Sequence, residues 1–404
     1  MFFKSIDTSL NTRKIADDVV SFEWDHIGDS IFYTTCDNLK RSCRVWKCFL
    51  HSIEKPTLIF EEHDPAFYVD ISRTKDHRFL TINCNTKRCS EVRVVDLHAN
   101  LPLAPILIQP RQENLEYFVE HSEQSFIIVT NADNCSNYKI VTTSSQHLNT
   151  EHLNASRWKT LIPHSDRTRI EDLDVFKNFL VIYERHEGRS QVRVASFTPN
   201  SNTYLIDLPE KIISIQPGIN MNLESTTLRF TYSSMITPEC TVDYCLQTHT
   251  SKIVRQIKLS DLKLGLNTEN LSYYQSQVPS GDVLVPLTLL HPSSLQLDNA
   301  NPVLLVAYGA YGHTTETRFH VEYISLLKRG WIVALAHVRG GGELGAQWYE
   351  AGRQTKKHNS FKDFINCAEY LVSKGYTSPS FITATAASAG GLLLGVVLNQ
   401  RPEL

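Results

Sequence analysis

Residues 381–398 read Phe-Ile-Thr-Ala-Thr-Ala-Ala-Ser-Ala-Gly-Gly-Leu-Leu-Leu-Gly-Val-Val-Leu, and this stretch decides the fold of the C-terminal part of the chain. The apolar run 381–386 predicts a strand, and residues 390–398 predict the beginning of a helix. The joint between them is a variant of the G-x-S-x-G nucleophile elbow, with Ala386 in the first small position. Such a tight turn strains its serine and tolerates only small neighbours. The pattern therefore predicts that Ser388 is a nucleophile presented between a strand and a helix.

Two hydrogen-bond donors are predicted beside Ser388. The first N–H groups of a helix have no partner and carry partial positive charge, so the Ala389 N–H can stabilise an oxyanion. Upstream, an apolar strand leads into Val306-Ala-Tyr308-Gly-Ala-Tyr-Gly312, and a hydrolase of this topology supplies its second donor at that place. The Tyr308 hydroxyl is the candidate. The alternatives are that Ser388 merely caps a helix and that Tyr308 merely closes a turn.

A glycine-rich segment lies between these two motifs. The sequence His337-Val-Arg-Gly-Gly-Gly-Glu-Leu-Gly345 has four glycines in six residues, which lets a loop pass close to the site. A phosphate-binding loop is excluded because the segment lacks both the Lys-Ser/Thr pair and the Rossmann spacing. His337 ends a predicted buried strand and precedes the serine, so we interpret it as structural rather than as a catalytic base.

From residue 268 onward, predicted strands alternate with predicted helices. The expected strands are 271–290, which is two strands joined by a turn at 279–282, and then 303–308, 331–337 and 381–386. The expected helices are 316–329, one capped by Asn359 or Ser360 that continues to Gly375, and one that begins at Gly390. Asp363 is expected in the favourable first turn of the second helix. This alternation predicts an α/β domain with a parallel sheet covered on both faces.

Residues 21 to about 265 show a different pattern, with short runs of alternating apolar residues between polar turns. Such a pattern is typical of antiparallel sheet. Five units of about 45 residues begin near Ser21, Ala66, Leu115, Arg169 and Ser214, a period that suits the four-stranded blades of a β-propeller. A sandwich with irregular loops is the alternative. We therefore expect a β-propeller over 1–267, with about five blades visible, and an α/β domain over 268–404.

The composition indicates a soluble globular protein. A formal charge of −3 and 42% hydrophobic residues exclude a nucleic-acid binder and a disordered chain. No leader pattern or transmembrane run is present, and nine irregularly spaced cysteines fit reduced thiols, so a cytoplasmic protein is expected. No cluster with metal-ligand spacing is seen, and neither a metal nor a cofactor is expected.

The dense motifs of the C-terminal part resemble the prolyl oligopeptidase family, most of all its oligopeptidase B branch and, within that branch, the prolyl endopeptidase-like proteins. The resemblance rests on the motifs Tyr308, Val338–Gly345, Trp348-Tyr349, Gly352-Arg353, Lys356-Lys357, Phe361–Phe364 and Ser388–Gly391. Weaker likeness extends into the first part through 21–24, 75–82, 232–238 and 243–244.

This resemblance implies a seven-bladed propeller that caps an α/β-hydrolase domain, and a buried active site that short substrates reach. It also implies that Ser388 attacks an acyl carbonyl, that a His accepts its proton and that an Asp orients this His. The implied substrates are short peptides. For the prolyl endopeptidase-like branch the resemblance implies instead esters or thioesters, and trafficking proteins as partners.

The sequence departs from this pattern after the serine. Only 404 − 388 = 16 residues follow Ser388, and they contain no His or Asp; Glu403 is the single acid. The propeller also shows five units where the resemblance implies seven. We therefore expect a truncated hydrolase domain and a fragment that is nearly inactive as written. A propeller interaction module with a vestigial hydrolase segment is the alternative from a different functional class.

Overall fold

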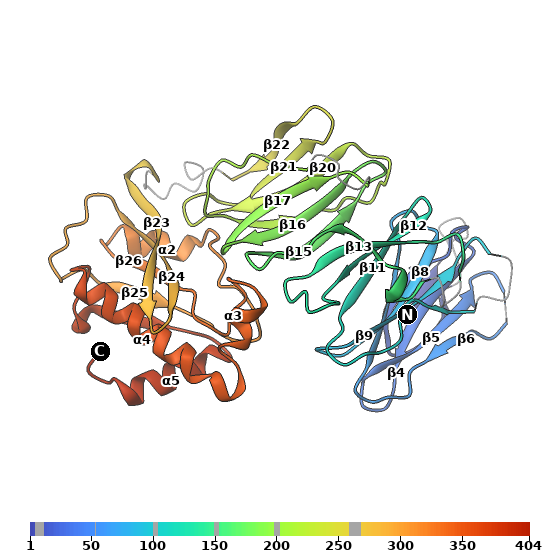
Figure 1. The fold of residues 1–404 in the computed structure, drawn as a ribbon, viewed down its shortest axis with the longest axis horizontal. Helices are drawn as coiled ribbons and strands as arrows, with labels where there is room; N and C mark the ends of the chain where they lie inside the picture. The colour runs from blue at the N-terminus through green and yellow to red at the C-terminus, as the bar shows by residue number, and fades with distance from the viewer. Residues whose placement is uncertain (5–11, 53, 100–103, 149–152, 198–202, 258–267) are drawn as a thin grey trace.

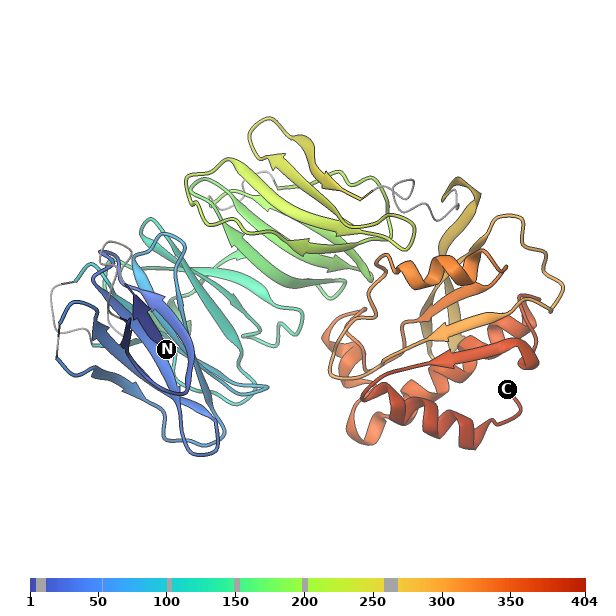
Figure 2. The ribbon, with the colours of Figure 1, turned by 180° about the vertical axis from the view of Figure 1, so that it is seen from behind.

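The computed structural model describes residues 1–4, 12–52, 54–99, 104–148, 153–197, 203–257 and 268–404. Five four-stranded antiparallel sheets follow one another along the first part of the chain, in an arc that leads to the α/β part (Figures 1 and 2). A two-stranded ribbon, β1 (Phe2–Lys4) with β2 (Thr12–Lys14), precedes them.

The strands of each sheet are consecutive in sequence. The first two sheets are β3 (Val19–Trp24), β4 (Ser30–Cys36), β5 (Ser42–Phe49) and β6 (Thr57–Glu61), then β7 (Tyr68–Arg73), β8 (Phe79–Asn85), β9 (Ser90–Asp96) and β10 (Ile106–Leu107). The third and fourth are β11 (Tyr117–Ser122), β12 (Ser125–Thr130), β13 (Lys139–Ser144) and β14 (Lys159–Ile162), then β15 (Thr168–Val175), β16 (Leu180–His186), β17 (Arg189–Ala195) and β18 (Tyr204–Leu205). The fifth is β19 (Ser214–Pro217), β20 (Thr227–Ser233), β21 (Cys240–Cys245) and β22 (Thr250–Gln256). A 3₁₀ turn, η1 (Ala155–Arg157), precedes β14.

The hydrophobic cores of this part lie between successive sheets. Phe32 of the first sheet shares a core with Leu80 of the second, and Phe79 of the second shares one with Phe126 of the third. Two further cores join the third sheet to the fourth and the fourth to the fifth. Because each interior sheet packs against both of its neighbours, these sheets are propeller blades, and the predicted blade starts lie within two residues of the observed ones.

The second part is built on one five-stranded sheet. Its strands are β23 (Leu271–Ser280), β24 (Val283–Pro292), β25 (Val303–Val306), β26 (Ile332–Ala336) and β27 (Ile382–Thr385), in the order β23-β24-β26-β25-β27. Only β26, β25 and β27 are mutually parallel, since β24 pairs antiparallel with both β23 and β26. The two strands predicted over 271–290 form this antiparallel hairpin, and the strands that alternate with helices are parallel, as predicted.

Helices cover both faces of this sheet. The helices are α2 (Val321–Leu327), α3 (Ala346–Glu350), α4 (His358–Ser373) and α5 (Gly390–Gln400), and three 3₁₀ turns are η2 (Thr268–Asn270), η3 (Gln354–Lys356) and η4 (Pro379–Phe381). Phe364 of α4 and Leu393 of α5 pack on one face, together with Val303 and Leu305. On the other face α2 packs with Met235 of the propeller.

Two predicted helix starts were wrong. Residues 316–320 are not helical, because Arg185 of β16 pairs with Glu316 (Nη2 to Oε1, 3.3 Å) and the Phe319 N–H donates to Ser233 Oγ (2.9 Å), which ties this segment to the propeller. Helix α4 begins at His358 with Lys357 at its cap, so neither Asn359 nor Ser360 caps it. The Ser360 hydroxyl donates instead to the Arg339 carbonyl of the glycine-rich loop, and the Gly352 carbonyl after α3 lies 3.3 Å from it.

The expected division after residue 267 falls in 258–267, outside the described residues; the last blade ends at Gln256 and the second sheet begins at Leu271. All nine cysteines are free thiols. None of the helices in the part of the chain that the structure describes is long and apolar enough to span a bilayer.

Candidate active site

Ser388 lies in the turn between β27 and α5, where the backbone reverses within four residues. Its φ is +53°, a left-handed conformation that costs free energy for a residue with a side chain. The turn is closed by hydrogen bonds from the Gly390 N–H to the Ala387 carbonyl (2.9 Å) and from the Gly391 N–H to the Ser388 carbonyl (2.9 Å). The side chain of Ser388 is exposed. A strained, exposed serine at a helix N-terminus is the arrangement that an elbow requires.

The small residues around Ser388 are required by space. A Cβ atom at Gly390 would lie 2.9 Å from the Ala386 Cβ, closer than real Cβ atoms approach, and 3.3 Å from the Ala307 carbonyl oxygen, which is a tight contact. A glycine here and an alanine at 386 therefore let the helix begin directly against the end of β25. This packing explains why Ala386 can replace the first glycine of the usual motif.

The hydroxyl of Ser388 is not used for capping. The cap residue of α5 is Ala389, and no side chain caps this helix. Among the described residues, the Ser388 hydroxyl has no hydrogen-bond partner, and the Ala389 N–H has no acceptor. The turn therefore presents one oxygen and one backbone donor to solvent, next to the positive end of α5.

Tyr308 comes to the same edge of the sheet because its strand is the neighbour of β27. β25 and β27 pair in parallel with Val306 opposite Thr385, so Tyr308 and Ser388 follow the carboxyl ends of adjacent strands. The Tyr308 Cδ2 lies 3.5 Å from the position that a Gly390 Cβ would occupy. The phenol is half-buried, and no hydrogen-bond partner of its hydroxyl occurs in the described ranges. The structure thus brings the predicted phenol against the start of α5.

The glycine-rich loop packs on the segment that carries Tyr308, as its composition predicts. The Gly312 N–H donates to the Gly340 carbonyl (3.1 Å), and a Cβ at Gly340 would lie 2.2 Å from the Gly309 carbonyl oxygen. Gly340 also has a φ of +96°, which only glycine adopts readily. Two backbones therefore touch here without intervening side chains.

A buried ion pair fixes this loop. Asp363 of α4 is fully buried and accepts from the Arg339 N–H (2.9 Å), from Arg339 Nε (2.9 Å) and Nη2 (2.6 Å), and from Ser280 Oγ (2.6 Å). The hydrogen bonds that the Arg339 guanidinium donates to Asp363 raise the pKa of Arg339. The expectation that Asp363 lies in the first turn of its helix was wrong, because α4 begins at His358 and has no acidic residue in its first turn. The sequence does not show that Arg339 folds back onto α4.

His337 is engaged by residues other than the serine. Its ring is buried, with Nε2 2.8 Å from Thr288 Oγ1 and Nδ1 3.4 Å from Glu343 Oε1. The backbone N–H of His337 donates to the Pro286 carbonyl (3.0 Å). Both ring nitrogens therefore have partners within the sheet and the glycine-rich loop. This agrees with its interpretation as a structural residue.

Lys357 is a residue of the site's surroundings that the prediction left without a role. Its ammonium group donates to the Gly309 carbonyl, directly after Tyr308, and lies 3.2 Å from Ser360 Oγ. Burial lowers the pKa of Lys357. The signal available in the sequence was the pair Lys356-Lys357, which does not reveal which lysine turns inward.

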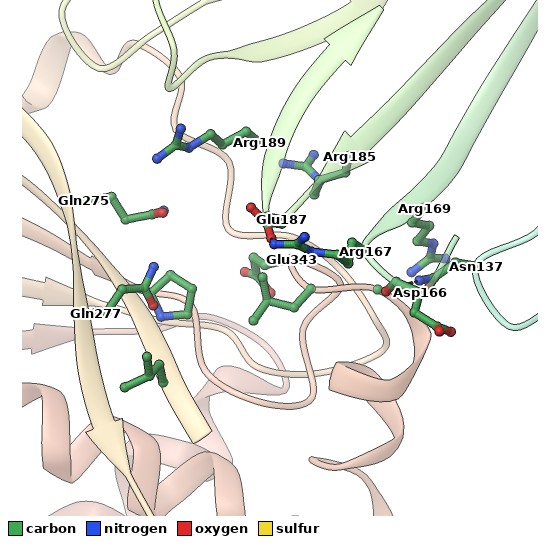
Figure 3. Close-up of a pocket in the computed structure, with 14 residues that line it drawn as sticks. Asn137, Asp166, Arg167, Arg169, Arg185, Glu187, Arg189, Gln275, Gln277 and Glu343 are labelled. Carbon is green, nitrogen blue, oxygen red and sulfur yellow. Dashed lines mark hydrogen bonds and ion pairs between the residues drawn. The ribbon is translucent and has the colours of Figure 1, made fainter. Parts of the chain in front are cut away.

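A mixed-charge cavity of about 460 Å³ separates the fourth blade from the α/β part (Figure 3). Gln275 and Gln277 line it from β23, and Arg185 and Arg189 line it from the blade. Burial alone would lower the pKa of Arg185, but the carboxylates around it, led by Glu171, outweigh burial and raise it. Within residues whose placement is described, no group of three or more His, Cys, Asp or Glu side chains is arranged to hold a metal.

Comparison with known proteins matches both parts of the chain. A model described as the N-terminal β-propeller domain of prolyl oligopeptidase matches residues 3–257, and one described as the prolyl oligopeptidase family matches 317–404. Dipeptidyl aminopeptidase BI from Pseudoxanthomonas mexicana is 33% identical over 411 residues, covering 99% of this chain and 54% of that protein. The prolyl endopeptidase-like protein from Homo sapiens is 33% identical over 390 residues, covering 96% and 51%.

The structure of oligopeptidase B from Trypanosoma brucei, in its closed form with covalently bound antipain, superposes with a TM-score of 0.85 at 32% identity. The match covers 95% of this chain and 54% of that one. The chain therefore spans about half the length of the relatives it matches.

Proposed function

This chain belongs to the prolyl oligopeptidase family, and on that premise we propose that Ser388 is the nucleophile of a serine hydrolase that cleaves short peptides. In this proposal residues 1–267 form the propeller and residues 268–404 the hydrolase domain. The observation that carries it is the turn at Ser388, with its positive φ, exposed hydroxyl and position before α5.

The chemistry follows from the groups around that turn. Ser388 Oγ adds to the acyl carbon, a C–O bond forms, and the electrons of the carbonyl π bond move to its oxygen. The Ala389 N–H and the Tyr308 hydroxyl would donate to that oxygen, because neither has another partner among the described residues. The proton of the serine passes to a base, which gives it to the leaving amine as the C–N bond breaks and the carbonyl reforms. Water then adds to the acyl-enzyme, and the C–O bond to Ser388 breaks to release the acid and the free serine.

The residues that follow Ser388 in this chain do not supply a catalytic base. The 16 residues that follow Ser388 contain no His or Asp, and His337 is engaged by Thr288 and Glu343. Removing members of a catalytic triad lowers turnover by about 10⁴ to 10⁶. We therefore expect the Ser388 hydroxyl of the 404-residue chain to react slowly, although both oxyanion donors are present.

The second candidate function is an interaction module, and the missing base is the observation that favours it. Cleavage of esters or thioesters is an alternative within the first candidate, because the same oxyanion site serves every acyl substrate. An excess of thioester over dipeptide-amide hydrolysis would select that alternative.

Labelling with a fluorophosphonate probe tests the proposal on the chain as it is. We expect slow modification at Ser388 that is accelerated by imidazole in solution, which replaces the missing base. Ser388→Ala should abolish it, and Tyr308→Phe should slow it about tenfold or more because one oxyanion donor is lost.

Tyr311→Phe is the matched control, because Tyr311 lies in the same segment with an exposed side chain. Its labelling rate should equal that of the unchanged chain. Fast labelling without imidazole would contradict the expected inactivity, and labelling that persists in Ser388→Ala would contradict the nucleophile.

A further inference from the structure

A second and larger cavity, of about 790 Å³, lies between the propeller and the hydrolase part. Its walls come from the second, third and fourth blades, from the segment after Tyr308 and from α3 with the residues that follow it. The charged groups are Lys87, Arg88, Glu116, Arg169, Glu350 and Arg353. Arg169 of β15 lines this cavity and also the one in Figure 3. A space of this size suits a small ligand such as a short peptide.

The cations of the larger cavity outnumber its carboxylates by four to two. Glu350 already pairs with Arg88 (3.2 Å) and with Arg353 (2.9 Å), and Glu116 accepts from the Tyr138 hydroxyl (2.9 Å). Lys87 contacts the ring of Tyr311, with Nζ 5.5 Å from its centre. The surplus positive charge is notable in a chain whose formal charge is −3.

Arg169 is the cation for which the structure offers no structural role. It is half-buried, and in the described part of the chain its guanidinium has neither an ion pair nor a hydrogen bond. In the register of β15 and β16 it lies directly opposite Arg185, whose own charge is paired with Glu171 (2.8 Å) and Glu316. Two like charges opposite each other destabilise a sheet, so Arg169 does not serve the stability of the blade.

One residue of the larger cavity contacts a predicted residue of the candidate active site. His313 lines the cavity, and the ring centre of His313 lies 6.0 Å from that of Tyr308. The basic cavity therefore borders the segment that carries Tyr308.

We propose that this cavity binds a carboxylate carried by the substrate, and that Arg169 forms the ion pair with it. The inference rests on the proposed hydrolase function for its biological meaning, but it makes a claim about binding that does not depend on catalysis. The ligand class is a short peptide with a carboxylate, either an acidic side chain or a free C-terminus. A guanidinium matches a carboxylate with two parallel hydrogen bonds, which a lysine does not provide.

Isothermal titration of the full 404-residue chain with four peptides tests this. The probes are N-acetyl-Ala-X-Ala-amide with X as Glu, Gln or Lys, and N-acetyl-Ala-Gln-Ala with a free carboxyl terminus. We expect at least one carboxylate peptide to bind about tenfold more tightly than the Gln amide at low salt, a preference that shrinks as salt rises. The Glu amide and the free acid distinguish the two sources of the carboxylate.

Arg169→Gln should remove the preference without changing the affinity for the Gln amide, and Arg169→Lys should keep part of it. Arg157→Gln is the matched control, because Arg157 is exposed and lies on η1, away from both cavities. Circular dichroism checks that each variant is folded, and Arg169→Lys carries the test if Arg169→Gln is not.

Four outcomes would overturn the inference. The Glu, Gln and free-acid peptides could bind with equal affinity, or the Lys peptide could bind most tightly. The preference could survive Arg169→Gln, or no peptide could bind at millimolar concentration. Ser388→Ala should leave every one of these affinities unchanged. A failure of the proposed nucleophile, seen in the labelling experiment, is thereby separated from a failure of carboxylate binding.

Discussion

Replacing Asp363 by Asn should destabilise the hydrolase part strongly. The carboxylate is fully buried and accepts four hydrogen bonds, three of them from Arg339. An amide has one acceptor oxygen, and its NH₂ group would face donors, so the Arg339 charge would remain buried without compensation. Breaking a buried ion pair in this way costs about 3–5 kcal/mol.

Urea unfolding measures this loss. At a slope of about 2 kcal/mol per molar urea, the unfolding midpoint should fall by about 1.5–2.5 M. The matched control is Glu369→Gln on the same helix, because Glu369 pairs with Arg401 (2.5 Å) while both side chains are at least one-third exposed. An exposed pair is worth about 0–1 kcal/mol, so the control should unfold close to the unchanged chain.

The double variant Arg339→Met/Asp363→Leu separates charge from packing. It removes both ions together, so it should be more stable than Asp363→Asn alone. A midpoint for Asp363→Asn within the range of the Glu369→Gln control would refute the reasoning. The same conclusion would follow if the double variant were the least stable of all.

Two further outcomes are expected. Gly340→Ala should lower the free energy of unfolding by about 2 kcal/mol or more, because its Cβ would lie 2.2 Å from the Gly309 carbonyl oxygen. Gly391→Ala, with open space around its Cβ, should leave the free energy of unfolding unchanged or raise it. Thermal melting compares the two variants, and equal shifts in melting temperature would contradict the close contact at Gly340. Burial raises the pKa of Glu120 to about 7. Between about pH 4.5 and pH 7 the native state therefore keeps the proton of this carboxyl, whereas the unfolded chain has lost it. The free energy of unfolding falls as the pH rises through this range. At pH 8 the free energy of unfolding of Glu120→Gln should exceed that of the unchanged chain by about 2 kcal/mol, and at pH 4 the two should be equal. Urea unfolding at both pH values measures this difference. A difference that is the same at both pH values would argue against the titration of Glu120.

The elements with regular periodicity were predictable from the sequence, and so was the turn at Ser388. The blade starts repeat at a fixed spacing, and the joint at 386–391 combines small residues with a strand and a helix, so local chemistry alone specifies both. Long-range contacts were not predictable. The segment 316–320 has helical spacing, yet Arg185 and Ser233 of the propeller hold it in an extended form.

The same limit applies to the surroundings of the site. Asp363 and Arg339 are 24 residues apart, and no local pattern links them. Arg169 could be recognised as the beginning of a blade, but that no described residue pairs with it depends on where other segments of the fold place their charges. Single sequences encode turns and periods directly, whereas charge balance in a cavity appears only after the chain has folded.

The position of β27 has a consequence for how firmly the serine is held. Within the residues that the structure describes, this strand has one hydrogen-bonded neighbour, β25, and Thr383, Ala384 and Thr385 are exposed. The outer row of its backbone groups is therefore open to pairing with another extended segment. A strand that pairs with this edge would give β27 hydrogen-bonded neighbours on both sides. The mobility and reactivity of the hydroxyl at position 388 should therefore depend on which segment pairs with the outer edge of β27.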